Sequence, residues 1–146
     1  MTQLRELMTR DVKVITPDTT IGEAAKKMRD GNFGMMPVEE NDRMIGAISD
    51  RDIAIRAVAE GMDFSTKVRD VMSKGVAWAY DDETVEQAVA IMSERQVRRL
   101  PVVNRAKRLV GIVALGDLAV DSSVDSSEIK PVAEALSEIS KPPHIH

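Results

Sequence analysis

Hydrophobic and polar positions along the chain follow one arrangement twice, and the first copy shows it most clearly. An apolar stretch at 12–15 comes before a helical stretch that follows Thr20, and two short apolar runs at 35–38 and 44–48 flank a polar turn. Short apolar runs split by a turn are typical of a strand hairpin, whereas spacings of three and four residues are typical of a helix. With a last helix over about 50–60, the predicted order is β-α-β-β-α.

The second half of the chain repeats this order. Residues from Val68 match residues from Leu4, an offset of 64 (68 − 4). One inserted residue in the polar turn then shifts the offset to 65 (117 − 52), which brings Asp52 onto Asp117. A register kept over this length indicates two copies of one supersecondary unit. The remaining strands and the last helix of the second copy are expected at 76–79, 100–103, 109–113 and 116–120.

The central helix of each copy begins with a capping signature. In Thr20-x-x-Glu23 and Thr84-x-x-Gln87, the threonine hydroxyl can accept a bond from a free backbone N–H, and the Glu or Gln can accept one in return. Apolar residues follow each signature at helical spacing, so both helices are expected to present one face to the core.

The repeats divide the chain into residues 1–61 and 68–120, joined by a linker at 62–67. Because a unit of about 50 residues buries little surface alone, the two sheets are expected to pack against each other as one pseudo-two-fold module. The fold class is therefore mixed α/β, of the α+β type. Residues 121–146 form a polar spacer and a predicted short helix, whose apolar stripe packs either on its own domain or on a second copy.

Composition narrows the classes of function. A net charge of −4 and 3% aromatic residues exclude both a basic field over the whole surface and a set of base-stacking platforms for nucleic acid. The absence of cysteine, of a secretory signal and of a long apolar run favours a cytoplasmic protein that does not enter membranes. His144 and His146 lie at the C-terminal end, and no nucleophile–base constellation or metal site is indicated, so an enzyme is not expected.

The last strand and helix of each copy carry the most specific pattern, a Gly-x-x-Ser/Thr-x-x-Asp segment. It reads GAISDRD from Gly46 to Asp52 and GIVALGD from Gly111 to Asp117. Together with the duplicated β-α-β-β-α order and the Met-Thr and Met-Ser lead-ins, these segments resemble the cystathionine-β-synthase-type (CBS) repeat over about residues 4–120. The paired form is called a Bateman module. The run SDRDIAIRAVAEGMD is also similar to stand-alone bacterial proteins made of little more than one CBS pair.

The resemblance implies two clefts between the repeats that hold an adenosine-containing nucleotide (AMP, ADP or ATP) as a regulatory ligand, with no cofactor required. The Asp of each segment would take the ribose hydroxyls, because a carboxylate can accept both bonds from a diol. One cleft would use Ser49, Asp52, Ile48, Met36 and Pro37, with Tyr80 from the opposite repeat. The other would use Arg98, Arg99, Pro101, Ile112 and Asp117, with Ile15 and Thr16 from the opposite repeat.

The two clefts are not expected to be equivalent. Ala114 stands where the second segment should carry a hydroxyl, which removes one polar contact. Arg98 and Arg99, in contrast, match a basic pair that can clamp phosphate oxygens. Each assignment has an alternative: Asp52 and Asp117 also suit the first turn of a helix, and the two arginines also suit a solvated helix end.

These patterns predict a regulatory protein that binds a small nucleotide and acts on a separate, unidentified effector protein. CBS pairs generally assemble as two-fold dimers, so the resemblance implies a homodimer. The alternative is a structural dimerisation scaffold whose clefts stay empty or are filled by side chains. Nucleic acid and membranes are not expected as partners, given the composition.

Overall fold

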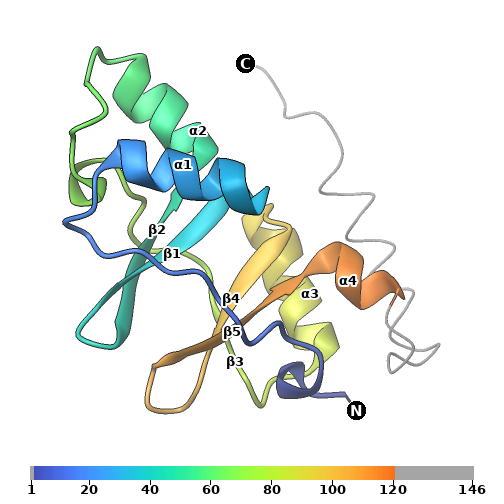
Figure 1. Ribbon diagram of the computed structural model, residues 1–146. Helices are drawn as coiled ribbons and strands as arrows, with labels where there is room; N and C mark the ends of the chain where they lie inside the picture. Colours follow the sequence, from blue (N-terminus) through green and yellow to red (C-terminus); the bar gives the residue numbers. More distant parts are fainter. Residues whose placement is uncertain (1, 121–146) are drawn as a thin grey trace. The chain divides into compact units, whose positions relative to one another are not determined.

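The computed structural model describes residues 2–120 and has the predicted α+β character (Figure 1). Its helical segments are η1 (Leu4–Glu6), α1 (Ile21–Gly31), α2 (Asp50–Asp52), η2 (Ile53–Val58), η3 (Val68–Asp70), α3 (Val85–Arg95) and α4 (Leu115–Val120). Its strands are β1 (Met35–Glu40), β2 (Arg43–Ser49), β3 (Ala79–Tyr80), β4 (Arg99–Val103) and β5 (Leu109–Ala114). The predicted C-terminal helix falls within 121–146 and lies outside the described residues.

The described chain forms two compact units, and these are not simply the two sequence copies. One unit is Lys13–Val76, and the other combines residues 2–12 with 77–120. The short segment that leads into each copy therefore belongs to the unit built mainly from the other copy. The proposed boundaries at 1–61 and 68–120 follow the duplication of sequence, whereas the packing exchanges the two lead-in segments.

In the unit Lys13–Val76, β1 and β2 form an antiparallel hairpin, and Figure 1 shows α1 and α2 beside it. The stretch predicted as a strand at 12–15 is reduced to one parallel bridge between Ile15 and Val38. The core between these elements consists of Ile15, Ile21, Ala24, Met28, Met36, Val38, Ile48, Ala57, Val68, Val71 and Met72. Apolar residues of α1, η2, η3 and both strands therefore meet in one cluster.

The lead-in segment at η3 closes this unit. The N–H of Val68 donates to the Thr19 carbonyl at 2.8 Å, and Ala47 and Ser73 exchange backbone hydrogen bonds of 3.0 and 2.9 Å. Gly46 permits this approach, because a Cβ at that position would lie 2.5 Å from the Ser73 carbonyl oxygen. The close contact explains why β2 carries a glycine in its centre.

The last helix of the first copy is present but changes its winding. After α2 the chain continues as the π-helix η2, and the N–H of Ala59 bonds the carbonyl of Ala54, five residues back, at 2.9 Å. Gly61 ends the helix with a φ of 76°, as the sequence predicts. Ile55 and Val58 lie on the exposed side of this segment.

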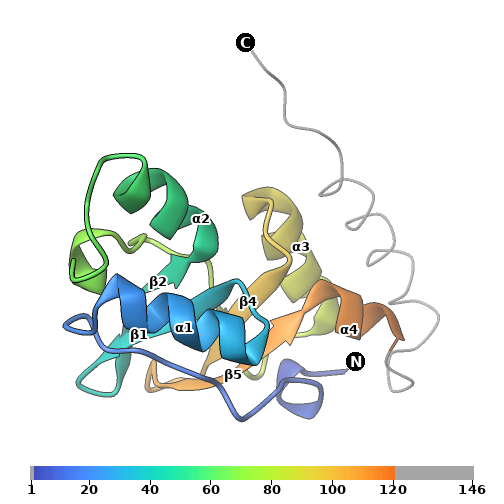
Figure 2. The same ribbon diagram turned by 45° about the horizontal axis from the view of Figure 1, so that its top comes forward.

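In the other unit the sheet order is β3-β4-β5, with β3 parallel to β4 and β4 antiparallel to β5. The apolar pattern predicts a strand at 76–79, but only Ala79 and Tyr80 pair, because β3 bonds a single neighbour at the edge of the sheet. Figure 2 shows α3 and α4 beside this sheet. Its core consists of Leu4, Met8, Ala77, Ala79, Val85, Ala88, Val89, Met92, Leu100, Val102, Val113, Leu115 and Leu118.

The N-terminal lead-in at η1 closes this unit in the same way. Thr9 and Ile112 exchange backbone hydrogen bonds of 2.8 and 3.0 Å, and the N–H of Leu4 donates to the Glu83 carbonyl at 2.9 Å. At Gly111 a Cβ would lie 2.5 Å from the sulfur of Met8. In both units the lead-in segment thus packs against a glycine of the hairpin. The nearest atom is a backbone carbonyl oxygen at Gly46 and a side-chain sulfur at Gly111.

The threonine part of both predicted helix caps is confirmed, and the return bond is found at α3 but not at α1. The Thr20 hydroxyl accepts a bond from the N–H of Glu23, and the Thr84 hydroxyl accepts one from the N–H of Gln87, both at 3.2 Å. The side chain of Gln87 also accepts from the N–H of Thr84 at 2.9 Å, which completes a capping box at α3. These local bonds hold the start of each central helix.

Candidate functional site

The carboxylate of Asp52 accepts hydrogen bonds from two residues of its own unit and forms an ion pair with a third. The N–H of Ser49 donates to Oδ2 at 3.0 Å, and the Ser49 hydroxyl accepts from the N–H of Asp52 at 3.0 Å, which forms a reciprocal cap on α2. The Ser73 hydroxyl donates to both carboxylate oxygens at 3.1 and 3.3 Å, and Arg56 Nε lies 3.7 Å from Oδ1. With only 13% of its side chain exposed, Asp52 is available to a ribose only in competition with these donors.

Asp117 occupies the equivalent position in α4, and its surroundings differ. It is exposed, and no hydrogen bond or ion pair joins its carboxylate to another group within residues 2–120. Ala114 stands where Ser49 stands in the first copy, so no hydroxyl is present to cap α4. Both aspartates lie in the first turn of their helices, as the alternative raised by the sequence expects, but within the described residues only Asp52 also takes part in a reciprocal cap.

Arg98 and Arg99 are exposed at the beginning of β4. Arg99 pairs directly with Ala114 across β4 and β5, so both side chains stand on the same face of the sheet. The corresponding pair in the first copy is Met35 with Ser49. In the second copy Arg99, the first residue of β4, therefore lies beside Ala114, the last residue of β5 before α4.

The apolar residues proposed for contact with the adenine differ in accessibility. Met36 and Ile48 pair across the first hairpin, and neither side chain has exposed surface. Pro37 and Pro101 are also buried, whereas Ile112 is half-buried. These side chains form part of the packing of each hairpin, so the polar residues at the strand and helix ends are the accessible part of the predicted set.

The ring of Tyr80 contacts two other side chains of its own unit, Trp78 and Arg105. Its ring meets that of Trp78 edge to face, with centroids 4.8 Å apart, and the Arg105 guanidinium lies 3.9 Å above the ring centroid. Arg105 in turn makes two hydrogen bonds, of 2.9 and 2.8 Å, to the carboxylate of Asp82 and lowers the pKa of that group. One face of the tyrosine is therefore occupied by a fixed cation, a neighbour that the sequence did not indicate.

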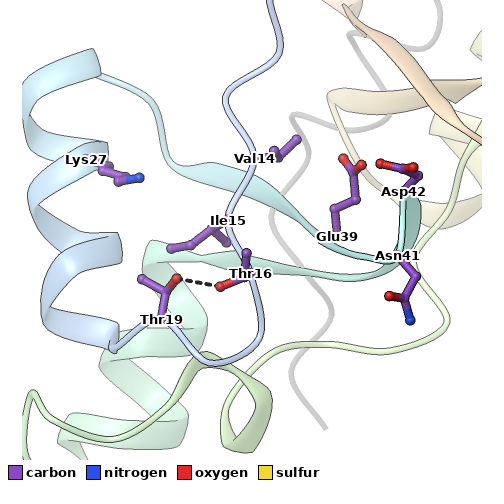
Figure 3. A pocket seen from close by; sticks show the side chains of 8 residues that line it. All are labelled: Val14, Ile15, Thr16, Thr19, Lys27, Glu39, Asn41 and Asp42. Carbon is purple, nitrogen blue, oxygen red and sulfur yellow. Dashed lines mark hydrogen bonds between the residues drawn. The ribbon is translucent and has the colours of Figure 1, made fainter.

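Ile15 and Thr16 line an open pocket in the unit Lys13–Val76 (Figure 3). The cavity has a volume of about 330 Å³. Figure 3 shows the segment at 14–16 between α1 on one side and the β1–β2 hairpin on the other. Thr16 is exposed and shares a hydrogen bond of 2.9 Å with the hydroxyl of Thr19, so hydroxyl groups face this space.

The same pocket contains charged and amide groups that sequence reasoning missed. Its wall includes Lys27 of α1 and Glu39, Asn41 and Asp42 of the hairpin. Asn41 and Asp42 both adopt positive φ, at 55° and 63°, which shapes the turn toward the pocket edge. The Asn-Asp turn was visible in the sequence, but its nearness to Thr16 depends on the Ile15–Val38 bridge.

A second arginine–aspartate pair lies in the unit Lys13–Val76, where Arg69 donates to Asp18 at 2.9 and 3.2 Å. This hydrogen bond lowers the pKa of the Asp18 carboxyl, with a further contribution from Lys67. Asp18 and Asp82 are equivalent by the 64-residue offset, yet their arginine partners come from different elements, η3 for Asp18 and the β4–β5 turn for Asp82. Both pairs are exposed and fix strand and turn segments beside the predicted contact residues.

Within residues 2–120 no group of three or more His, Cys, Asp and Glu side chains is arranged to hold a metal ion. His144 and His146 lie outside the described residues. Among the helices of the described part of the chain, none has the length and hydropathy to cross a membrane.

Residues 4–58 and 68–120 each match the model of a family described as CBS domain. The CBS domain-containing protein YhcV of Bacillus subtilis is 41% identical over 140 residues, which cover 96% of each chain. A crystal structure of Hypoxic Response Protein I with two coordinated zinc ions is similar with a TM-score of 0.75 and 32% identity, over 81% of this chain and 97% of that one. The CBS domain pair of protein MJ0100, in complex with 5′-methylthioadenosine and S-adenosyl-L-methionine, is similar with a TM-score of 0.69 and 29% identity, over 82% and 94%.

Proposed function

Because this chain belongs to the CBS-domain family and carries two CBS domains in tandem, we propose that it is a regulatory module that binds an adenosine-containing ligand. The observation that carries the proposal is the exposed carboxylate of Asp117, which stands at the Asp position of the Gly-x-x-Ser/Thr-x-x-Asp segment. A charged acceptor free of internal partners within the described chain suits the adjacent hydroxyls of a ribose. The adenosine ligands of the MJ0100 pair support the same class of ligand.

The phosphate side of the ligand is proposed to contact Arg98 and Arg99. Both are exposed, and Arg99 stands beside Ala114 at the end of the hairpin that leads into α4. Guanidinium groups bind phosphate oxygens through paired N–H donors, which would favour AMP, ADP or ATP over an uncharged nucleoside.

The role that follows is regulation rather than catalysis. A ligand changes the state of a protein only through different affinities for two states, and that difference can be passed to a binding partner. We propose that the effector is a separate protein, whose identity the chemistry of the site does not specify. The contact residues proposed here bind and orient, and none is paired as a nucleophile with a base.

Thermal unfolding with AMP, ADP, ATP and S-adenosylmethionine tests the ligand proposal. A ligand present at about 100 times its dissociation constant should stabilise the protein by about 2.7 kcal/mol, a shift of several degrees in midpoint for a chain of this size. Arg98→Met/Arg99→Met should reduce the shift for the phosphorylated ligands. Folded, nucleotide-free protein that shifts with none of them would favour the alternative, a ligand-free dimerisation scaffold.

We further propose that the chain forms a homodimer through the exposed face of η2. Ile55, Val58, Met62 and Phe64 are exposed apolar side chains on this helix and the turn after it, and Phe64 is 77% exposed. Such a cluster favours association. In a two-fold antiparallel pairing, Arg51 at the start of the helix would meet the partner subunit's Glu60 at its end, twice, so the charges are self-complementary.

The oligomeric state of matched variants tests this assembly. Ile55→Glu/Val58→Glu should convert a dimer into a monomer in light scattering at micromolar concentration, because it buries charge at the centre of the contact. Arg51→Glu should weaken the dimer and Arg51→Glu/Glu60→Arg should restore it, whereas Lys107→Glu at the exposed β4–β5 turn should have no effect. A monomeric wild-type protein, or a dimer unaffected by all of these changes, would contradict the proposal.

A further inference from the structure

We propose that the unit Lys13–Val76 carries a separate ligand site, beside Phe64, that binds an aromatic α-amino acid. The site is a cavity of about 480 Å³, within the range of ~300–1,000 Å³ typical of small-molecule sites. Its walls come from the beginning of α1 and from the turn between η2 and η3, and they consist of Thr20, Gly22, Glu23, Lys26, Phe64 and Ser65. None of these residues belongs to the set proposed for the adenosine ligand.

Phe64 stands at the edge of the cavity, with 77% of its surface exposed, on a turn that hydrogen bonds hold in place. Its carbonyl accepts the N–H of Gly22 at 3.0 Å. The carboxylate of Asp63 accepts the N–H of Ser65 at 2.8 Å, which fixes the turn on either side of the ring. A large aromatic ring is therefore presented to solvent from a fixed backbone, and exposed apolar surface next to a hollow is typical of a binding site.

Gly22 permits this turn to approach α1 closely. A Cβ at position 22 would lie 3.1 Å from both the Cβ and the carbonyl oxygen of Phe64, which is tighter than an ordinary van der Waals contact. Glu86 occupies the equivalent position in α3 by the 64-residue offset. The second copy therefore carries a side chain where the first copy leaves room for the turn that holds the ring.

Two opposite charges stand at the rim of the cavity. Glu23 and Lys26 are three residues apart on α1, so their side chains are neighbours on the helix surface. Both are exposed, and within residues 2–120 neither side chain takes part in a hydrogen bond or an ion pair. An α-amino acid carries an ammonium and a carboxylate on one carbon, and these match the two rim charges. Gln87 and Ala90 occupy the equivalent positions in α3, so the charge pair is confined to the first copy.

The side chain of the ligand is expected to lie against the ring of Phe64. Aromatic rings favour offset-stacked and edge-to-face contacts with each other, which favours an aromatic side chain over an aliphatic one. The N–H of Gly22 donates to the Phe64 carbonyl, and that of Glu23 donates to the threonine hydroxyl that caps α1. The carboxylate of the ligand is therefore bound by the ammonium of Lys26 rather than by these N–H groups.

Amide chemical shifts of the full chain, titrated with L-tryptophan, tryptamine and indole-3-propionate, test the proposal. L-tryptophan should shift the amides of Gly22, Phe64 and Ser65 at millimolar concentration, since a ligand of about fifteen non-hydrogen atoms is expected to bind an open site in this range. Tryptamine lacks the carboxylate and indole-3-propionate lacks the ammonium, so each should bind about two- to fivefold more weakly. Phe64→Ala should weaken the binding of all three by about tenfold.

Matched charge variants show which side chain binds which end of the ligand. Lys26→Met should weaken the binding of L-tryptophan and indole-3-propionate and leave that of tryptamine unchanged. Glu23→Gln should weaken the binding of L-tryptophan and tryptamine and leave that of indole-3-propionate unchanged. Glu86→Gln, at the beginning of α3, is the control and should change none of the three affinities. All three substituted side chains are exposed, so the variants are expected to fold.

The proposal is overturned by wild-type spectra that do not shift with millimolar L-tryptophan, or by L-tryptophan binding that both charge variants leave unchanged. Loss of binding in Ile55→Glu/Val58→Glu would also overturn it, because the site would then require a second copy of the chain. None of these measurements involves a nucleotide. The unfolding experiment with AMP, ADP, ATP and S-adenosylmethionine therefore tests the adenosine proposal separately, and either can fail while the other stands.

Discussion

Asp52 and Asp117 stand at the same position of a duplicated segment, and their environments differ in two hydroxyl groups. The Ser49 hydroxyl accepts from the N–H of Asp52, and the Ser49 N–H and the Ser73 hydroxyl donate to the Asp52 carboxylate, whereas within residues 2–120 the Asp117 carboxylate has no such bond. A segment duplicated within one chain therefore does not define one role. The neighbours of a carboxylate decide whether it stabilises a helix start or remains available to a ligand.

Substitutions at Gly46 and Gly111, the glycines beside the two lead-in segments, are expected to show the largest difference in stability between the copies. Gly46→Ala should destabilise the protein by about 2–3 kcal/mol, because the new methyl group meets a backbone carbonyl that cannot move without breaking the Ala47–Ser73 bonds. Gly111→Ala should cost about 1 kcal/mol or less, because the flexible side chain of Met8 can adjust. Denaturant unfolding measures both values, and equal costs would show that the two contacts are equally rigid.

Substitutions at Ser49 and Ala114, the equivalent residues before α2 and α4, are expected to change the stability by smaller amounts and in opposite directions. Ser49→Ala should cost about 1 kcal/mol through loss of the cap on α2, and Ala114→Ser should stabilise by about 0.5 kcal/mol by supplying a cap to α4. Unfolding free energies of the two single variants measure these effects. A stability of Ala114→Ser below that of the wild type would mean that position 114 is not the N-cap of α4.

The pH dependence of stability gives the smallest expected effect. The pKa of Asp18 and that of Asp82 are both lowered in the folded protein, by the hydrogen bonds of Arg69 and Arg105. Stability from each pair is therefore present above the ordinary carboxyl value of 3.8 and is lost as the pH falls through the lowered folded value. Arg69→Met and Arg105→Met should each lower the unfolding midpoint near neutral pH.

The difference from wild type should shrink well below pH 3.8, where the carboxylates are protonated in every variant. Arg105→Met should have the larger effect near neutral pH, because it also removes the contact with the Tyr80 ring. Midpoints that differ from wild type equally at all pH values would show that the arginines act through packing alone. Exposed pairs of this kind are screened by salt, so the measurement belongs at low ionic strength.

Structural features that depend on residues close together in the sequence could be predicted from the sequence. The central helices, the hairpins and the threonine caps of α1 and α3 agree with the sequence, since turns, caps and helical spacing act over a few residues. The strand predicted at 12–15 is reduced to one bridge. The shortened β3 and the π-helical winding of η2 differ, because strand pairing at an edge and the detailed winding of a helix depend on the rest of the unit. The thirteen contact residues proposed from the family pattern remain a proposal, and the structure adds Ser73, Arg105 and Lys27 to their surroundings.

The sequence by itself determined that the chain contains two copies of a β-α-β-β-α unit of the CBS family, because a duplication and its caps are encoded in local order. Only the tertiary structure decided which copy each lead-in joins and, through Ser73, which of two equivalent aspartates accepts a hydrogen bond from a lead-in segment. The physical reason is distance along the chain. Asp52 and Ser73 are separated by 21 residues, so their hydrogen bond forms only when η3 packs against β2 and closes the unit.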